Sequence, residues 1–275
     1  MSADFVVFWQ HLPEQLNPVA LRIGGFGLRW YGLMYLAAFA TVYFLVRRRL
    51  GKENLPFTPD QVSAFLGWAA LGVLAGGRLG YVLFYEPGYY LANPARILSP
   101  FSAEGKFTGI SGMSYHGGLV GLLLAAALFA RAQKLSFWKW ADFFTPAIPL
   151  GYTFGRIGNF VNGELYGRPT AVPWGMFFTG DPGRLRHPSQ LYEAFFEGIF
   201  LFCVLWGIRK KELPAGTLTA LYFMGYGIVR FAVEFFREPD PQLGFVLGPL
   251  TLGQIFCALM ILAGAGAMPR PKNPR

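Results

Sequence analysis

Apolar residues gather into seven long stretches of this chain, and short polar connections separate them. A helix needs about 20 mostly apolar residues to cross the hydrocarbon core of a bilayer, so stretches of this length predict membrane-spanning helices. The pattern places the spans at about residues 29–46, 62–84, 115–132, 139–160, 190–208, 216–236 and 250–267. We therefore expect an all-α integral membrane protein whose residues 1–275 form a single polytopic membrane domain.

Helix-start signals precede several of these stretches. Thr58-Pro59-Asp60-Gln61 has the pattern of a capping box with proline at the first helical position. Ser136 is a candidate cap for the fourth span, and Pro188-Ser189 opens the fifth. These signals support helices over strands.

Basic residues mark one side of the predicted topology. With seven spans, the connections after the first, third, fifth and seventh spans all lie on the same side of the membrane. The positive-inside rule assigns that side to the cytoplasm, so we expect the N-terminus outside and the C-terminus in the cytoplasm. The residues concerned are Arg47, Arg48, Arg49, Lys52, Arg131, Lys134, Lys139, Arg209, Lys210, Lys211, Arg270, Lys272 and Arg275.

Composition supports a membrane protein and argues against other classes. The chain is 53% hydrophobic and only 14% charged, against about 25% charged residues in soluble domains. Its net charge of +9 does not indicate nucleic-acid binding, because the basic residues lie beside apolar segments instead of on one polar face. Residues 1–10 lack the basic region of a signal peptide. The two cysteines, Cys203 and Cys257, lie in apolar runs and are expected to pack, so we predict no metal and no cofactor.

Several ionisable residues lie inside the spans. Arg78, Arg156 and Arg230 belong to spans two, four and six, which all run outward, so each arginine is expected in the outer half of the membrane. His116 opens span three and Tyr31 lies near the start of span one, again at the outer end. Because charges at membrane depth are costly, they usually face an interior cavity and serve a function. For two of these residues a structural alternative stays open. Arg78 could instead snorkel to lipid phosphates, and His116 could be only a helix-start residue at the interface.

Spans four and six carry polar side chains at helical spacing. Span four ends in the segment Gly155-Arg156-Ile157-Gly158-Asn159-Phe160-Val161-Asn162-Gly163-Glu164, where Arg156 and Asn159 lie one turn apart on one face. In span six the spacing of Tyr226, Arg230, Glu234 and Arg237 also places them on one face. Glu234 is expected to pair with either arginine; the alternative is a purely structural pair between helices. The charged loop residues Arg168, Arg184 and Arg186 are expected at a solvated or headgroup-facing edge.

Arginines gathered at headgroup depth are suited to binding an anionic phosphate. Guanidinium groups bind phosphate in bidentate fashion and stay charged at any relevant pH, and they stabilise charge that develops on a leaving phosphate. A nearby histidine can act as a general base. Since the two cysteines lie in other spans, the attacking nucleophile is expected to come from a second substrate. The residues thus predict a lipid-phosphate site open to the outer leaflet.

At these residues the chain resembles the bacterial prolipoprotein diacylglyceryl transferase family. The signature is Gly155-Arg156-x-Gly-Asn159-Phe160-x-Asn162-Gly163-Glu164-x-x-Gly167. Four further motifs follow the family's order: Arg29-Trp30-Tyr31-Gly32-Leu33, Ser114-Tyr115-His116-Gly117-Gly118, Arg186-His187-Pro188-Ser189-Gln190-Leu191-Tyr192-Glu193 and Arg230-Phe231-x-x-Glu234-Phe235-Phe236-Arg237. Together the motifs extend the resemblance over nearly the whole chain.

The resemblance implies a multi-pass enzyme of the bacterial inner membrane with its active site toward the extracytoplasmic side. Such an enzyme transfers the diacylglyceryl group of phosphatidylglycerol to the lipobox cysteine thiol of a prolipoprotein signal peptide, forming a thioether and releasing glycerol 1-phosphate. No cofactor or metal is implied. The competing class is a lipid transporter or flippase, whose site usually lies near the midplane between inverted repeats.

The resemblance also implies roles for individual residues. His116 and Arg230 match catalytic positions, and which of them activates the thiol stays open. Arg156 matches the phosphatidylglycerol-binding arginine, with Asn159 and Glu164 lining the same region. Further polar positions around the cavity are matched by Tyr31, Tyr226, Glu234 and Arg237.

Overall fold

A computed structural model describes residues 3–23, 26–99, 112–239 and 244–269 of the chain. The described residues are mostly helical, and they divide into two compact units. The larger unit comprises Met1–Arg49 and Ala141–Arg275, and the smaller unit comprises Leu50–Trp140. That residues 1–275 form a single domain stays a prediction.

The apolar stretches fold into helices near the predicted boundaries. In the described part of the chain, three helices are long and apolar enough to cross a membrane: α3 (Trp30–Lys52), α4 (Pro59–Phe84) and the continuous helical segment Ser189–Ile208. That segment comprises α9 (Ser189–Glu193), the π-helical η3 (Ala194–Phe200) and α10 (Leu201–Ile208). Shorter apolar helices are α6 (Tyr115–Ala132), α11 (Thr217–Val233) and α12 (Leu252–Ala267). The helical membrane class is confirmed, whereas the count of seven spans and the orientation stay predictions.

The predicted fourth span is interrupted. It consists of α7 (Phe137–Phe144), the 3₁₀ turn η2 (Thr145–Ala147) and α8 (Ile148–Val161). Pro146 and Pro149 have no backbone N–H, so carbonyls of the preceding turn lose their helical donors. Arg49 supplies replacements, because its Nη1 donates to the carbonyls of Asp142 at 3.2 Å and Phe143 at 2.6 Å. Arg49 is therefore buried within α3, whereas the predicted first span ended at residue 46 and placed Arg49 in the connection after it.

Short antiparallel hairpins accompany the helices of the larger unit, which the all-α prediction did not include. Within the described ranges they are β1–β2 (Val19–Ile23, Phe26–Arg29), β3–β4 (Met176–Phe178, Asp181–Arg186) and β5–β6 (Phe245–Leu247, Leu250–Thr251). Two N-terminal helices, α1 (Ala3–Gln10) and α2 (Leu12–Gln15), lie beside them. A small core of Phe160, Met176 and Phe178 joins β3 to the end of α8.

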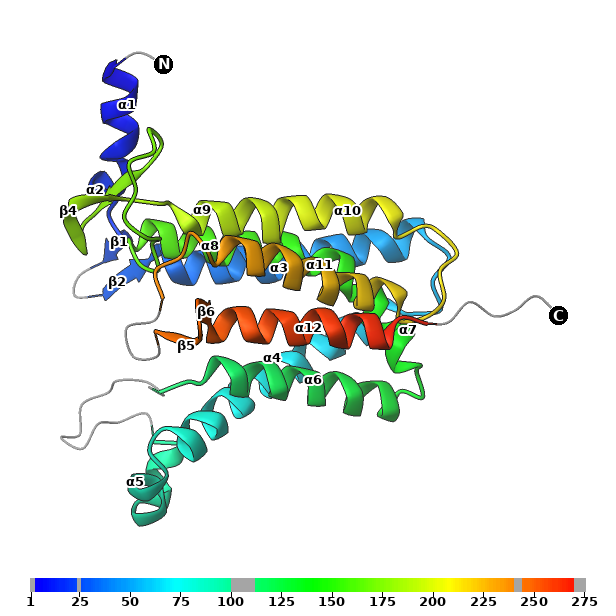
Figure 1. The fold of residues 1–275 in the computed structure, drawn as a ribbon. Coiled ribbons are helices and arrows are strands. Elements are labelled where there is room, and N and C mark those ends of the chain that lie inside the picture. The colour runs from blue at the N-terminus through cyan, green and yellow to red at the C-terminus, as the bar shows by residue number, and fades with distance from the viewer. Residues whose placement is uncertain (1–2, 24–25, 100–111, 240–243, 270–275) are drawn as a thin grey trace. The chain divides into compact units, whose positions relative to one another are not determined.

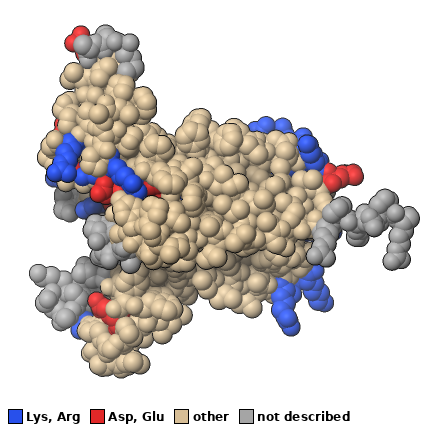
Figure 2. All heavy atoms as spheres, viewed as in Figure 1, with Lys and Arg blue, Asp and Glu red and all other residues tan. Residues whose placement is uncertain are grey.

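Helix direction in the larger unit alternates as the charge pattern predicts. α3, α10 and α12 run toward one end of the unit, while α8 and α11 run toward the end that carries the hairpins (Figure 1). Charged atoms gather at the ends of the helices, and the flanks between them are almost free of charge (Figure 2). Large apolar side chains such as Leu36, Phe44 and Leu262 are exposed on these flanks. Such a surface is suited to contact with lipid chains.

In the smaller unit, α4 packs against α6 through glycines. A Cβ added to Gly121 would lie 2.0 Å from the carbonyl oxygen of Gly72, and one added to Gly76 would lie 2.3 Å from that of Gly117. Small residues at this spacing let two membrane helices approach closely. The predicted capping box at the start of α4 is confirmed, since Gln61 N donates to Thr58 Oγ1 and Thr58 N donates to Gln61 Oε1. The short helices α5 (Pro87–Ala92) and η1 (Pro94–Ile97) follow α4.

Candidate active site

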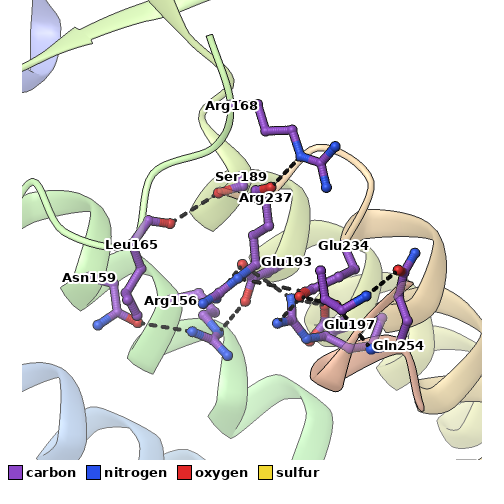
Figure 3. A network of polar contacts seen from close by, with 12 residues as sticks. Arg156, Asn159, Leu165, Arg168, Ser189, Glu193, Glu197, Glu234, Arg237 and Gln254 are labelled. Atoms are coloured by element: carbon purple, nitrogen blue, oxygen red, sulfur yellow. Dashed lines mark hydrogen bonds and ion pairs between the residues drawn. The ribbon is translucent and has the colours of Figure 1, made fainter. Parts of the chain in front are cut away.

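A buried polar cluster lies where α8, α9, η3, α11 and the start of α12 meet in the larger unit (Figure 3). Its charged members are three arginines and three glutamates, so that the cluster is neutral when all six are ionised. They are Arg156, Arg230, Arg237, Glu193, Glu197 and Glu234. Buried charges persist only when they are paired, and this cluster meets that condition.

Arg156 projects into the cluster from α8. Its Nε lies 2.8 Å from Glu193 Oε2 and donates to the hydroxyl of Tyr152 at 2.6 Å. Its Nη1 donates to Asn159 Oδ1 at 3.3 Å, and Asn159 Nδ2 donates in turn to Glu164 Oε1 at 2.8 Å. The predicted common face of Arg156 and Asn159 is therefore confirmed. Nη2 of Arg156 makes no hydrogen bond to any residue that the structure describes, which leaves one donor for a ligand.

The predicted pairing of Glu234 forms, although α11 ends at Val233, so that Glu234 and Arg237 lie in the turn after the helix instead of on the predicted helix face. Glu234 Oε2 lies 2.7 Å from Arg230 Nη2 and 3.7 Å from Arg237 Nε. Thr251, at the start of α12, donates to Glu234 Oε1 at 2.9 Å. Glu234 therefore pairs with both arginines at once, and these contacts join the end of α11 to α12.

The two predicted tyrosines lie on the margins of the cluster. The Tyr226 ring stands perpendicular to that of Tyr152, with centroids 5.8 Å apart. The Tyr31 hydroxyl lies 3.1 Å from that of Tyr35, and the Tyr31 ring packs against Gly158 of α8. Tyr226 thus packs beside Tyr152 of α8, and Tyr31 packs beside Gly158 of the same helix.

The prediction missed two central members of the cluster, Glu193 and Glu197. Both carboxylates are fully buried, and Glu197 Oε2 accepts from the Tyr152 hydroxyl at 2.5 Å. The sequence did contain a signal for them. Two acidic residues four apart in an apolar span carry a free-energy cost at membrane depth, as the arginines of the other spans do.

The loop that follows α8 is held in place by backbone contacts. Gly167 N donates to the His187 carbonyl at 2.8 Å, and Arg168 N donates to the Phe236 carbonyl at 2.9 Å. Gln190 Nε2 donates to the backbone carbonyl of Glu164 at 2.7 Å. These bonds join the loop to the segment before α9 and to the end of α11. They fix the backbone that carries Glu164, whose side chain is exposed apart from its bond to Asn159.

Two of the three arginines assigned to a solvated edge are structural instead. Arg186 is buried and pairs with Asp181 and, at 2.7 Å, with Glu238. Burial opposes its charge, yet these two carboxylates raise the pKa of Arg186 above its usual value. Arg168 Nε donates to the carbonyl of Arg237 at 2.7 Å. Arg184 is exposed, as predicted.

His116 belongs to the smaller unit. It lies in the first turn of α6, where Ser114 Oγ caps the helix by accepting from Gly117 N at 3.2 Å, and it is exposed. An exposed histidine in a first helical turn is compatible with a general base and with an interfacial helix-start residue, the two interpretations made from the sequence. Its catalytic role stays a prediction.

Arg78, also in the smaller unit, does not snorkel. It is buried, and its guanidinium donates to the carbonyls of Ile97 at 2.6 Å, Arg96 at 2.9 Å and Gly112 at 3.2 Å. The guanidinium also lies 4.9 Å from the centroid of the Tyr90 ring. Arg78 therefore anchors the segment that follows α4.

We expect Arg78→Lys to destabilise the protein by about 2 kcal/mol, since hydrogen bonds from a charged donor contribute about 1.5–3 kcal/mol each. The lysine keeps the charge but cannot reproduce the planar fork that reaches three carbonyls. Thermal unfolding in detergent measures the effect. Arg131→Lys, at an exposed position of α6, is the matched control and should unfold like the unmodified protein; equal melting of the two variants would contradict the anchoring role.

No group of three or more His, Cys, Asp or Glu side chains in the described part of the chain has an arrangement that could hold a metal ion. The three carboxylates of the cluster are instead paired with arginines. The groups of the cluster that could bind a ligand are therefore guanidinium nitrogens, which favour an anion.

The family model described as prolipoprotein diacylglyceryl transferase matches residues 18–269. The chain belongs to this family. It is 55% identical over 269 residues to a protein of Chlorobaculum tepidum, covering 96% of this chain and 93% of the relative. It is 51% identical over 255 residues to one of Bordetella parapertussis (92% and 94%) and 48% identical over 249 residues to one of Geobacter sulfurreducens (90% and 93%). All three relatives are named phosphatidylglycerol–prolipoprotein diacylglyceryl transferase.

Membership of the family confirms the resemblance carried by the five motifs. It favours a transferase over the transporter alternative. The roles of the individual site residues rest on geometry and stay proposals.

Proposed function

We propose that this chain transfers the diacylglyceryl group from phosphatidylglycerol to the lipobox cysteine of prolipoprotein signal peptides. The observation that carries the proposal is the buried, charge-balanced arginine–glutamate cluster built from the family's motif residues. The names of the relatives supply the two substrates, a phosphatidylglycerol and a prolipoprotein. No cofactor or metal is part of the proposed reaction.

The proposed site for the phosphate lies beside Arg156 and Arg230. Arg156 has Nη2 free of hydrogen bonds to described residues, and its side chain is 17% exposed, the most open of the three arginines. Arg230 Nη1 is buried and makes no hydrogen bond within the described ranges, its nearest carboxylate oxygen being 3.6 Å away on Glu193. An unsatisfied buried donor is costly, so both nitrogens favour an incoming phosphate oxygen.

In the proposed reaction a carbon–sulfur bond forms and a carbon–oxygen bond breaks. The thiolate attacks the glyceryl carbon that bears the phosphate, and the bonding electron pair leaves with the phosphate oxygen as glycerol 1-phosphate. Arginines close to that oxygen stabilise the charge it gains. The thiol proton has to go to a base, because a free thiol with a pKa of about 8.5 is mostly protonated near neutral pH.

From the family resemblance we propose that one of the two residues His116 and Arg230 activates the thiol, and His116 is tested as the base. General base catalysis typically contributes about 10²–10⁴-fold. If His116 is the base, we expect His116→Gln to lower the transfer rate by about a hundredfold and to flatten the dependence of the rate on pH, measured between about pH 5 and 8. Initial rates across this pH range measure both effects.

His11→Gln is the control for this experiment, since His11 is half-exposed, its Nδ1 lies 2.7 Å from Glu14 Oε2 and its ring stacks on that of Phe177. It should keep the rate and the pH profile. A His116→Gln enzyme with an unchanged rate and pH profile would assign the base role elsewhere.

The proposed setting is the bacterial inner membrane, with seven spans, an external N-terminus, a cytoplasmic C-terminus and an active site facing outward. Two features support this orientation. The polar cluster lies toward the hairpin-bearing end of the larger unit, where α8 and α11 finish (Figure 1). The basic residues that follow α10 lie at the opposite end, as the positive-inside rule requires of the cytoplasmic side.

A further inference from the structure

One buried carboxylate, that of Glu193, contacts all three arginines of the cluster. Glu193 Oε2 lies 2.8 Å from Arg156 Nε, whereas Oε1 lies 3.3 Å from Arg237 Nη1 and 3.6 Å from Arg230 Nη1. Arg156 comes from α8 and the other two come from the end of α11 and the turn after it. Glu193 thus joins the two polar faces that the proposed phosphate site requires.

The neighbouring carboxylate, Glu197, has a different set of contacts. Among the described residues, Glu197 lies within 4 Å of one arginine, Arg230, at 3.9 Å, and it accepts a hydrogen bond from the Tyr152 hydroxyl at 2.5 Å. Glu234 pairs with the two arginines of its own helix end and not with Arg156. The bridging geometry is therefore particular to Glu193 among the carboxylates of the cluster.

The local helix geometry brings Glu193 against α8. Glu193 ends α9, and the next seven residues form the π-helical η3; π-helical turns are rare and occur frequently at functional sites. Thr153 Oγ1 of α8 donates to the Ala194 carbonyl at 3.3 Å. A Cβ added to Gly198 would lie 2.0 Å from Thr153 Oγ1. The close contact of α8 with η3 thus depends on a glycine and sets the approach of Glu193 to Arg156.

We infer that Glu193 is a positioning residue for the transfer reaction, the shared counter-ion that holds Arg156, Arg230 and Arg237 in the geometry that binds the phosphate of the lipid. The inference rests on the proposed function. Without the negative charge, the arginines keep only Glu197 and Glu234 as counter-ions and shift toward them. A displacement of about 1 Å at a reacting centre costs about a hundredfold in rate.

The test compares Glu193→Gln and Glu193→Asp with the unmodified protein, purified in detergent, using phosphatidylglycerol and a synthetic lipobox peptide. Glu193→Gln should lower kcat/KM for phosphatidylglycerol by about a hundredfold and leave KM for the peptide unchanged. Glu193→Asp keeps the negative charge, but its side chain is one methylene shorter and places the carboxylate farther from the arginines. We therefore expect a rate between those of Glu193→Gln and the unmodified protein. Glu212→Gln, an exposed carboxylate beyond α10, is the matched control and should show no change.

A double-variant cycle separates positioning from a general structural effect. If Glu193 acts by holding Arg237, then Arg237→Gln should lower the rate by itself but add little in the Glu193→Gln background. Fully additive losses, or equal losses in KM for both substrates, would overturn the inference. A folded Glu193→Asp protein with the unmodified rate would also overturn it, and this outcome can be read even when Glu193→Gln does not fold. Absence of transfer by the unmodified protein would instead contradict the proposed function itself.

Discussion

Arg156→Ala is expected to lower diacylglyceryl transfer by about a thousandfold, the largest effect of any single substitution in this chain. Removing one donor that stabilises developing negative charge typically costs about 10²–10³-fold, and Arg156 is also the most exposed of the three arginines of the cluster. The change removes a ligand for the phosphate in the ground state and for the leaving group in the transition state. Initial rates with phosphatidylglycerol and a lipobox peptide measure the loss.

The variant should remain folded, because Glu193 retains Arg230 and Arg237 as partners at 3.6 and 3.3 Å. A symmetrical size-exclusion peak and a melting temperature within a few degrees of the unmodified protein test this. Arg184→Ala removes an exposed arginine of β4 and should leave the rate unchanged. An Arg156→Ala protein that is as active as the Arg184→Ala control would remove the basis for the phosphate site.

Gly167→Ala is expected to lower both the stability and the activity of the protein. A Cβ at this position would lie 2.3 Å from the Phe236 carbonyl oxygen and 2.7 Å from the Cβ of His187. The carbonyl oxygen of His187 would lie 2.8 Å away, and both this carbonyl and that of Phe236 accept backbone hydrogen bonds, so the loop itself must move. We expect a loss of about 1–3 kcal/mol in stability, as for other overpacked sites, and at least a tenfold loss of transfer, because the same loop carries Glu164.

Gly183→Ala provides the matched control for this substitution. A Cβ on Gly183 meets no described atom within 4 Å, and the residue lies in the neighbouring strand β4. Thermal unfolding and transfer rates of the two variants are to be compared side by side. If both melt and react alike, the tight contact of Gly167 with the end of α11 has no role in holding the loop.

Helices were predictable from the sequence because their signal is local. Apolar stretches placed α3, α4 and α12 within a few residues, and the capping box marked the start of α4. The break between α7 and α8 was not predicted, although Pro146 and Pro149 were visible. Whether a proline breaks a membrane helix depends on partners for the freed carbonyls, and here that partner is Arg49, 93 and 94 residues away in sequence.

The site was predictable where helical spacing decides which side chains meet. The pairs Arg156–Asn159 and Arg230–Glu234 follow from one helix each. The role of Arg78 was left open and Arg186 was wrongly placed at a solvated edge, because the partners of both lie in separate segments that no local pattern identifies. Glu193 and Glu197 are a different case, since their position in an apolar span was itself a signal.

The central claim is that the arginine–glutamate cluster transfers a diacylglyceryl group from a lipid phosphate to a thiol. Its most direct test is to incubate the purified protein with phosphatidylglycerol and a lipobox peptide and then to measure the mass of the peptide. We predict a peptide heavier by one diacylglyceryl group, attached at the cysteine, with glycerol 1-phosphate released in equal amount, and both products formed about a thousandfold more slowly by Arg156→Ala. A peptide of unchanged mass with the folded, unmodified protein, or the same increment formed at the same rate by Arg156→Ala, would contradict the account.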